Sequence, residues 1–262
     1  MVSGIQVSSL RPLLKTPEQV SEAFSRFARM GCKAVQVQWI DPSVPPEHIA
    51  RTLRDTGMSS VSVQDFYTDV SADPEYYTKL CIVTGSEWLC VSRVPEEYKT
   101  APGITAFARA LDRLSDTIAP MGLKLCFHPT SPDYQMIDGR TLVDALMDAV
   151  QRPLSLCLDL YHIWKSGLSM PGLIRQYSGR VCMVHFKDCR GDELVPAGQG
   201  EIDWEPAIEA CLQTEVAYGF VEQETWARDP FECMDEALSW LDEQLWAKPT
   251  CTSDGITFSA QK

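Results

Sequence analysis

The sequence is poor in histidine and in basic side chains. Its 262 residues include four histidines, and 23 Lys and Arg residues stand against 36 Asp and Glu residues, which gives a formal net charge of −13. Nucleic acid and anionic membrane surfaces repel a chain with this charge balance. No apolar run approaches the ~20 residues that cross a bilayer. We therefore expect neither a nucleic-acid partner nor a membrane partner.

Signals for cysteine pairing are also absent. Ten cysteines are scattered along the chain, mostly inside apolar runs, and no Cys-x-x-Cys pair occurs. The opening residues, Met1-Val-Ser-Gly-Ile, carry no signal-peptide pattern. These features predict reduced thiols that act as small core residues in a cytoplasmic protein.

The chain is rich in alternating strand-like and helix-like segments. Short apolar runs predict strands at residues 5–10, 34–40, 60–65, 88–92, 123–127, 154–158, 181–184 and 218–222. Helical patterns occur at residues 16–30, 45–54, 74–83, 104–119, 140–150, 170–177, 204–212 and 230–245. Eight strand–helix units predict an α/β fold, a single (β/α)8 TIM barrel over residues 1–247, with residues 248–262 as an irregular tail. The alternative, a doubly wound open sheet, would need a glycine-rich loop after the first strand, and residues 10–15 contain no glycine.

Chemically active side chains gather just beyond the predicted strands, where a TIM barrel has its active site. These residues are Gln64, Asp65, His128, Asp159, His162, His185, Lys187, Asp188, Glu222 and Glu224. Three of the four histidines belong to this set. Carboxylates and imidazoles from successive strands suit Mn2+, Mg2+, Co2+ or Zn2+. The pattern predicts a site for one divalent ion.

Purely structural roles remain open for each of these residues. Asp159 could be a helix cap, and His185 a hydrogen-bonded core residue. Glu222 could form a salt bridge with Lys187, which could equally pair with Asp188.

Four motifs occur in order along the second half of the chain. They are Asp159-x-x-His162, His185-x-Lys-Asp188, Gly198-x-Gly-x-x-Asp203-Trp and Val221-Glu-Gln-Glu224. In this order and spacing they resemble the xylose-isomerase-like TIM barrels, a superfamily of sugar isomerases and epimerases also called the AP-endonuclease family 2 fold. The chain looks most similar to the branch that contains inosose dehydratase and sugar phosphate isomerase/epimerase proteins. The first half of the chain shares only the strand–helix rhythm.

The resemblance implies that Asp159, His185 and Glu222 bind one divalent ion, with Mn2+ preferred over Mg2+, Co2+ or Zn2+. It also implies that His162 binds substrate.

Strand five departs from the family pattern. Relatives carry a glutamate on this strand or several residues after it, where this chain has Cys126 and Gln135. The fourth ligand would then be Gln135 through its amide oxygen, His128, or a water molecule.

The implied activity is isomerisation, epimerisation or dehydration of a sugar or polyol, through proton abstraction next to a carbonyl and a metal-stabilised enediolate. Candidate bases are Glu224, Glu222 and His128. Lys187 would hold a substrate hydroxyl or neutralise the enediolate.

Further substrate contacts are expected near other strand ends. Trp39 would form an apolar wall for a sugar ring, Gln64 a polar contact, and Arg190 a contact for a carboxylate or phosphate. Because no glycine-rich phosphate loop is present, a non-phosphorylated polyol or keto-sugar is favoured.

Two other classes of function are compatible with such a fold. One is a degenerate or partner-dependent barrel, either a subunit of the C-glycoside-cleaving type or a non-catalytic sugar binder. The other is an AP-endonuclease-type nuclease, which would need more histidines and a basic groove. A homo-oligomer remains open in each case.

Overall fold

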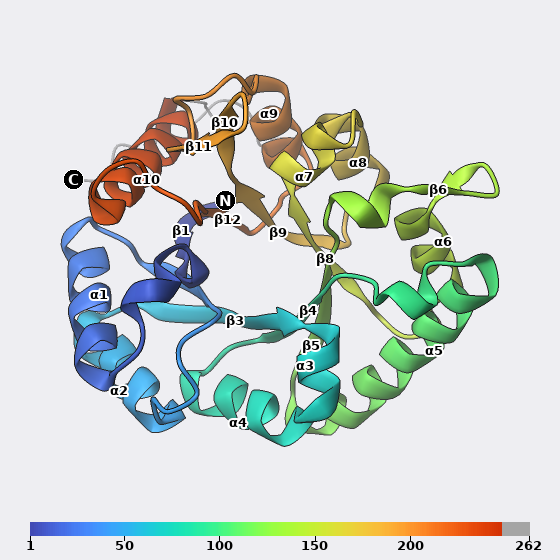
Figure 1. Ribbon diagram of the computed structural model, residues 1–262, viewed down its shortest axis with the longest axis horizontal. Coiled ribbons are helices and arrows are strands. Elements are labelled where there is room, and N and C mark those ends of the chain that lie inside the picture. Colours follow the sequence, from blue (N-terminus) through green and yellow to red (C-terminus); the bar gives the residue numbers. More distant parts are fainter. Residues whose placement is uncertain (248–262) are drawn as a thin grey trace, which may run out of the picture.

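Eight parallel strands form a closed barrel at the centre of the molecule, and helices surround it (Figure 1). The computed structural model describes residues 1–247, so the predicted tail at 248–262 lies outside the described residues. Around the barrel the strand order is β1-β12-β9-β8-β5-β4-β3-β2. The barrel strands are β1 (Val2–Gln6), β2 (Ala34–Val37), β3 (Ser59–Phe66), β4 (Trp88–Ser92), β5 (Lys124–His128), β8 (Ser155–Asp159), β9 (Val181–Phe186) and β12 (Tyr218–Val221). The prediction of a single (β/α)8 barrel is confirmed.

Helices form the outer layer of the fold. They are α1 (Pro17–Arg29), α2 (Pro46–Thr56), α3 (Tyr67–Ala72), α4 (Pro74–Thr84), α5 (Ala101–Ile118), α6 (Leu142–Ala149), α7 (Leu160–Lys165), α8 (Met170–Gln176), α9 (Glu205–Gln213) and α10 (Pro230–Ala247). The ring closes where α10 reaches α1, with the rings of Phe27 and Phe231 6.2 Å apart. None of the helices within residues 1–247 combines the length and apolar composition that a bilayer span requires.

Short elements lie next to the strand ends, and the sequence patterns did not predict them. Two hairpins pair β6 (Met136–Ile137) with β7 (Arg140–Thr141), and β10 (Asp188–Arg190) with β11 (Glu193–Val195). The 3-10 helices are η1 (Val7–Leu13), which is kinked at Leu10, and the single turns η2 (Glu96–Tyr98), η3 (Ala119–Met121) and η4 (Ser131–Tyr134). The helices α3 and α7 have six residues each and begin directly after β3 and β8.

The first two predicted strands were too long. The run at 5–10 leaves β1 after Gln6, because the Gln6 side chain accepts a hydrogen bond from the Ser8 amide and starts η1. Ile5 and Val7, two residues apart, are both buried and gave the strand-like pattern, although Val7 already belongs to the turn. The run at 34–40 stops at Val37 because Trp39 has φ of 55°, a left-handed conformation that ends an extended strand.

The inside of the barrel is layered along its axis. A layer of apolar and thiol side chains fills it, and includes Cys126, Cys157, Met183 and Phe220. Since strand side chains alternate between faces, the residue two positions later on each of these strands also points inward. Those later residues lie at the carboxyl ends of the strands and are polar.

Candidate metal centre and active site

Four polar side chains converge at the carboxyl end of the barrel. They are His128, which ends β5, Asp159, which ends β8, His185 in β9, and Glu222, directly after β12. These strands are consecutive neighbours in the barrel. All four residues are buried, with at most 6% of their surface exposed.

The donor atoms of these residues are spaced as ligands of one ion would be. His185 Nδ1 lies 3.1 Å from Glu222 Oε2 and 3.2 Å from His128 Nε2, and His128 Nε2 lies 4.0 Å from Asp159 Oδ2. Within residues 1–247, Asp159 Oδ2 and Glu222 Oε2 are buried and accept no hydrogen bond, and the cation that they face is the Lys187 ammonium, at 3.3 and 3.2 Å. Ligand atoms that bind one ion at ~2.1 Å are separated by ~3–4 Å. Asp159, His185 and Glu222 are thus spaced as ligands of one ion, and His128 lies next to them as a candidate fourth ligand.

Asp159 serves two purposes with its two oxygens. Oδ1 accepts a hydrogen bond of 3.0 Å from the His162 amide and caps α7, whereas Oδ2 faces the cluster. Burial raises the pKa of Asp159, but the Lys187 ammonium and His162 outweigh it and lower the pKa to about 2. The helix-cap and metal-ligand interpretations of this residue are thus compatible.

A chain of buried amides orients His185 from the opposite side of the barrel. Gln6 Nε2 donates to Gln36 Oε1 at 2.8 Å, Gln36 Nε2 donates to Gln64 Oε1 at 3.0 Å, and Gln64 Nε2 donates to Gln38 Oε1 at 3.2 Å. This order makes Gln36 Oε1 an acceptor, and it lies 2.5 Å from His185 Nε2. With Nε2 as the donor to Gln36, the Nδ1 lone pair of His185 faces the cluster, which is the arrangement that a metal ligand needs.

Burial keeps His128 neutral. It lowers the pKa of this imidazole to about 3, with a further contribution from His185. A neutral imidazole can serve as a metal ligand.

Lys187 follows β9 and enters the same cluster as a charge. Its Nζ lies 2.7 Å from Glu224 Oε1, 3.2 Å from Glu222 Oε2 and 3.3 Å from Asp159 Oδ2. Burial favours the neutral amine, yet the carboxylates of Glu222, Asp159 and Glu224 prevail and hold the pKa of Lys187 above its usual value. The predicted pairing of Lys187 with Glu222 is confirmed, but one ammonium faces three carboxylates. A divalent ion at the cluster would reduce this negative surplus.

Asp188 has a different role from its neighbour. Its Oδ2 accepts hydrogen bonds from the amides of Gly198 and Gly200, both at 3.0 Å, and from Trp204 Nε1 at 2.9 Å. A Cβ on Gly200 would lie 2.0 Å from Asp188 Oδ1, so this position requires glycine. The motif that begins at Gly198 therefore anchors a loop beside the site. The alternative pairing of Lys187 with Asp188 is not formed, because Lys187 pairs with Asp159, Glu222 and Glu224.

His162 and Glu224 lie at the entrance to the cluster. His162 Nε2 is 3.7 Å from Asp159 Oδ2, and its Nδ1 is 2.8 Å from Ser131 Oγ. Burial lowers the pKa of His162. Burial, together with the charge of Glu222, raises the pKa of Glu224. Both side chains are partly exposed, at 20% and 36%, so both can reach a bound molecule.

The structure does not bring the remaining predicted contacts to this cluster. Gln135 is exposed after η4, Arg190 is exposed on β10 and donates to the Gln199 carbonyl, and Trp39 donates to Asp65 Oδ1. Gln64 is buried inside the barrel within the amide chain. His128 is thus the strand-five residue that the structure places beside Asp159, His185 and Glu222.

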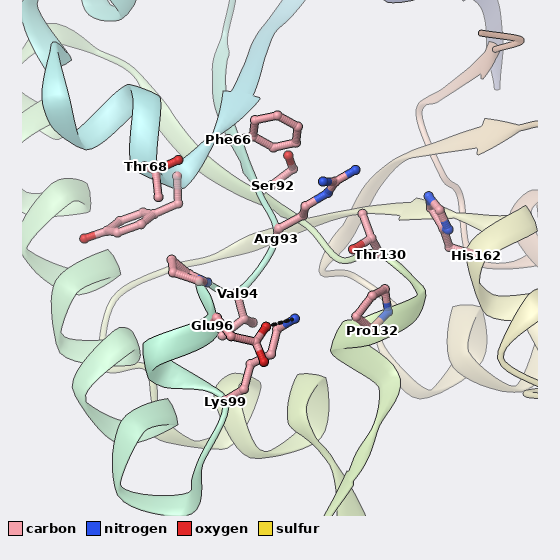
Figure 2. Close-up of a pocket in the computed structure, with 12 residues that line it drawn as sticks. Phe66, Thr68, Ser92, Arg93, Val94, Glu96, Lys99, Thr130, Pro132 and His162 are labelled. Atoms are coloured by element: carbon pink, nitrogen blue, oxygen red, sulfur yellow. Dashed lines mark ion pairs between the residues drawn. The ribbon is translucent and has the colours of Figure 1, made fainter. Parts of the chain in front are cut away.

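Two features near the cluster were missed. A pocket of about 480 Å³ adjoins it, and the residues around this pocket include Arg93, Lys99 and His162 (Figure 2). Arg93 directly follows β4, so the strand-end rule that selected the other candidates would have found it.

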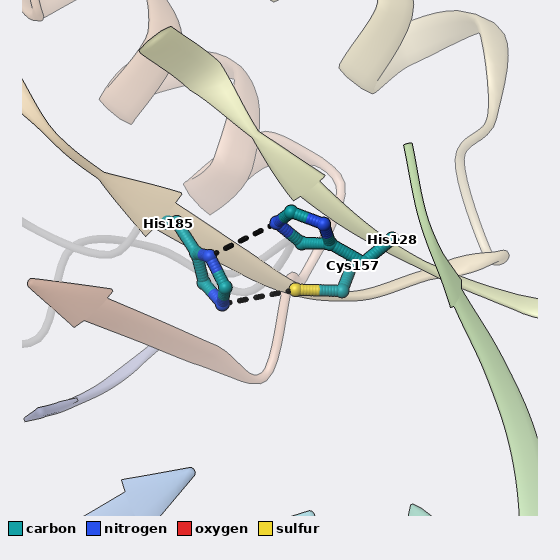
Figure 3. A group of neighbouring side chains, drawn as sticks. All are labelled: His128, Cys157 and His185. Atoms are coloured by element: carbon teal, nitrogen blue, oxygen red, sulfur yellow. Dashed lines mark hydrogen bonds between the residues drawn. The ribbon is translucent and has the colours of Figure 1, made fainter. Parts of the chain in front are cut away.

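The second missed feature is a thiol next to the cluster. Cys157 Sγ lies 3.2 Å from His185 Nε2, whereas Glu222 contacts Nδ1 of the same ring. Figure 3 shows the His185 ring in contact with Cys157 through one nitrogen and with His128 through the other. His128, Cys157 and His185 also have ligand-like spacing. Burial raises the pKa of the Cys157 thiol to about 12, which disfavours the thiolate that a metal ion needs.

Comparisons with known proteins agree with this architecture. A family described as "Xylose isomerase-like TIM barrel" matches residues 18–244. A sugar phosphate isomerase/epimerase from Parabacteroides distasonis superposes with a TM-score of 0.78 at 16% identity, over 93% of this chain and 98% of that one. The IOLI protein, crystallised with a bound zinc atom, superposes with a TM-score of 0.69 at 15% identity, over 94% and 97% of the two chains. At these identities the similarity shows the fold.

One sequence relative covers a shorter stretch. The rhizopine catabolism protein MocC of Rhizobium meliloti is 31% identical over 103 residues, which is 39% of this chain. The match spans about a third (31%) of MocC.

Proposed function

The chain belongs to the xylose isomerase-like TIM-barrel family, and on that premise we propose that it is a divalent-metal-dependent enzyme that isomerises, epimerises or dehydrates a sugar or polyol. The observation that carries the proposal is the ligand-like spacing of Asp159, His185 and Glu222, with His128 beside them. Three carboxylates face the single Lys187 ammonium there, which leaves negative charge that a divalent ion would neutralise. Sugar isomerases and epimerases among the proteins of similar fold, and the zinc found in one of them, support it.

Asp159, His185, Glu222 and His128 would hold the ion, with Mn2+ as the preferred metal. When bound, such an ion polarises a carbonyl oxygen and makes the proton on the adjacent carbon more acidic.

The other residues divide the remaining work. Glu224 is the carboxylate of the group that need not bind the ion, and it is the proposed base for the carbon-bound proton. Lys187 lies 2.7 Å from Glu224 and supplies a positive charge for the oxygen on which negative charge develops. His162, which faces both Asp159 and the pocket, would hold a substrate hydroxyl.

Metal content and proton exchange test the proposal together. We expect protein purified without chelator and supplied with Mn2+ to bind about one ion per chain, and to exchange the carbon-bound proton of a ketose with D2O. Asp159→Asn and Glu222→Gln should each lower the affinity for Mn2+ and the rate of proton exchange by at least about 100-fold. Asp116→Asn, which neutralises an exposed carboxylate on α5 paired with Arg152, is the matched control and should change neither. Protein that binds no ion after loading would refute the proposal.

The partner-dependent or non-catalytic barrel is the second candidate, and one observation favours it. The position of the family's strand-five glutamate is Cys126, which is fully buried in the layer below the cluster and contacts Cys182. Ion binding and sugar binding without any proton exchange would identify this alternative.

A further inference from the structure

Arg93 places an unpaired positive charge in the pocket beside His162. Arg93 has no carboxylate partner in the part of the chain that the structure describes, although acidic residues outnumber basic ones by 36 to 23. Absence of such a pair is common among the arginines, and what distinguishes Arg93 is its position in the pocket beside His162. Five of the other 13 arginines form carboxylate pairs: Arg26, Arg29, Arg140, Arg152 and Arg228. The side chain of Arg93 also makes no hydrogen bond to residues 1–247, so its five N–H donors are available to a ligand.

The protein holds Arg93 in this place from both its backbone and its side chain. Its φ is 62°, a left-handed conformation that is strained for a residue with a side chain. Its amide donates to the His128 carbonyl at 3.2 Å, which ties the strained turn to the end of β5. Its guanidinium lies 4.5 Å from the centre of the Phe66 ring, where a cation–π contact limits its movement.

The other charges around the pocket nearly cancel. Lys99 Nζ lies 3.0 Å from Glu96 Oε2, and both residues line the pocket. The hydroxyls of Ser92 and Thr130 add neutral polar groups. Arg93 is thus the unpaired charge among the residues that line the pocket. Its guanidinium has the planar geometry that binds a carboxylate or phosphate through two hydrogen bonds.

The pocket is continuous with the metal centre through His162. This residue lines the pocket and also lies 3.7 Å from Asp159 Oδ2. The two regions differ in charge, because the metal centre presents three carboxylates to one lysine whereas the pocket presents an unpaired arginine.

We propose that this pocket is an oxyanion subsite, in which Arg93 binds a carboxylate or phosphate of the substrate while the reacting carbon lies near Lys187. The inference rests on the proposed function and narrows it to acidic sugars. It revises two expectations from the sequence: the anion contact is Arg93 in place of Arg190, and the substrate is charged in place of neutral. The specificity of the enzyme would then come from a residue that does not touch the ion.

Binding of three ketoses tests the subsite without relying on catalysis. D-fructose, D-fructose 6-phosphate and D-fructuronate share one carbon frame and differ in the group at one end: neutral, phosphate or carboxylate. Calorimetry on the Mn2+-loaded protein should show one of the charged ketoses binding about 10- to 100-fold more tightly than D-fructose. The preferred anion identifies the source of the charge.

Arg93→Met should remove that preference and leave the affinity for D-fructose within about twofold, since only one charged contact is lost. Arg190→Met removes an exposed arginine outside the pocket and should preserve the preference. Equal affinity for all three ketoses, absence of binding by both charged ketoses, or equal losses for charged and neutral ketoses in Arg93→Met would overturn the subsite. If proton exchange fails while the charge preference depends on Arg93, the enzymatic proposal falls and the subsite stands.

Discussion

The two sides of the barrel interior carry chemically different side chains. The strands β5, β8, β9 and β12 end in ionisable groups that face one another, whereas β1, β2 and β3 contribute the neutral amides Gln6, Gln36 and Gln64. The ionisable half has the ligand atoms and titratable groups that the proposed function uses. The amide half has no titratable group, yet it determines which nitrogen of His185 faces the cluster. The geometry of the candidate site therefore depends on residues outside the ionisable cluster.

Removal of the Lys187 ammonium from the ionisable half should have the largest effect on stability. In metal-free protein, Lys187→Met leaves Asp159, Glu222 and Glu224 without their ammonium partner, and should lower the free energy of unfolding by about 3–5 kcal/mol. Saturation with Mn2+ should restore most of that loss, because the ion stabilises the carboxylates it binds. Urea unfolding with EDTA and with Mn2+ measures both values.

Lys124→Met provides the control for this variant. Lys124 pairs with Glu87 at the surface, with side-chain exposures of 62% and 44%, so its loss should cost less than about 1 kcal/mol. An equal loss of stability with and without Mn2+ in Lys187→Met would mean that no ion binds among these carboxylates.

The amide half can be broken separately. Gln36→Leu removes the acceptor of His185 Nε2, so the ring can rotate or change tautomer, and Mn2+ affinity should fall about 10- to 100-fold. Gln36→Glu retains an acceptor next to His185 and should preserve most of the affinity, although it loses the donor to Gln64. Metal titration of both variants distinguishes orientation of His185 from general damage to the core. Equal Mn2+ affinities of Gln36→Leu and the unchanged protein would mean that the amide half does not influence metal binding.

The ionisable half could be predicted from sequence because it follows strand periodicity. The pairs Cys157/Asp159 and Met183/His185 each place an apolar residue and a polar residue on the same face of a strand. Parallel strands then carry the polar residues to one end of the barrel, whatever their separation along the chain.

The amide half could not be predicted in this way. Gln36 and His185 are 149 residues apart, and β2 and β9 are not neighbours in the barrel, so only the closed structure brings them together. A buried glutamine on a strand is also an unremarkable residue in sequence. The loop contacts of Asp188 were not predicted either, because a carboxylate next to a lysine in the sequence suggests that the two residues pair with each other.

The smallest effect is expected at Gln135, where the sequence left a metal ligand open. The residue is exposed after η4, and its carbonyl accepts a hydrogen bond from the Leu142 amide. Gln135→Ala should therefore leave Mn2+ affinity unchanged within about twofold, since the backbone contact survives, whereas His128→Ala should lower it at least about tenfold. Metal titration of the two variants side by side decides which residue supplies the strand-five ligand. A tenfold loss in Gln135→Ala would mean that this loop moves to the ion when it binds, and that the ionisable half is assembled by the metal instead of being preformed.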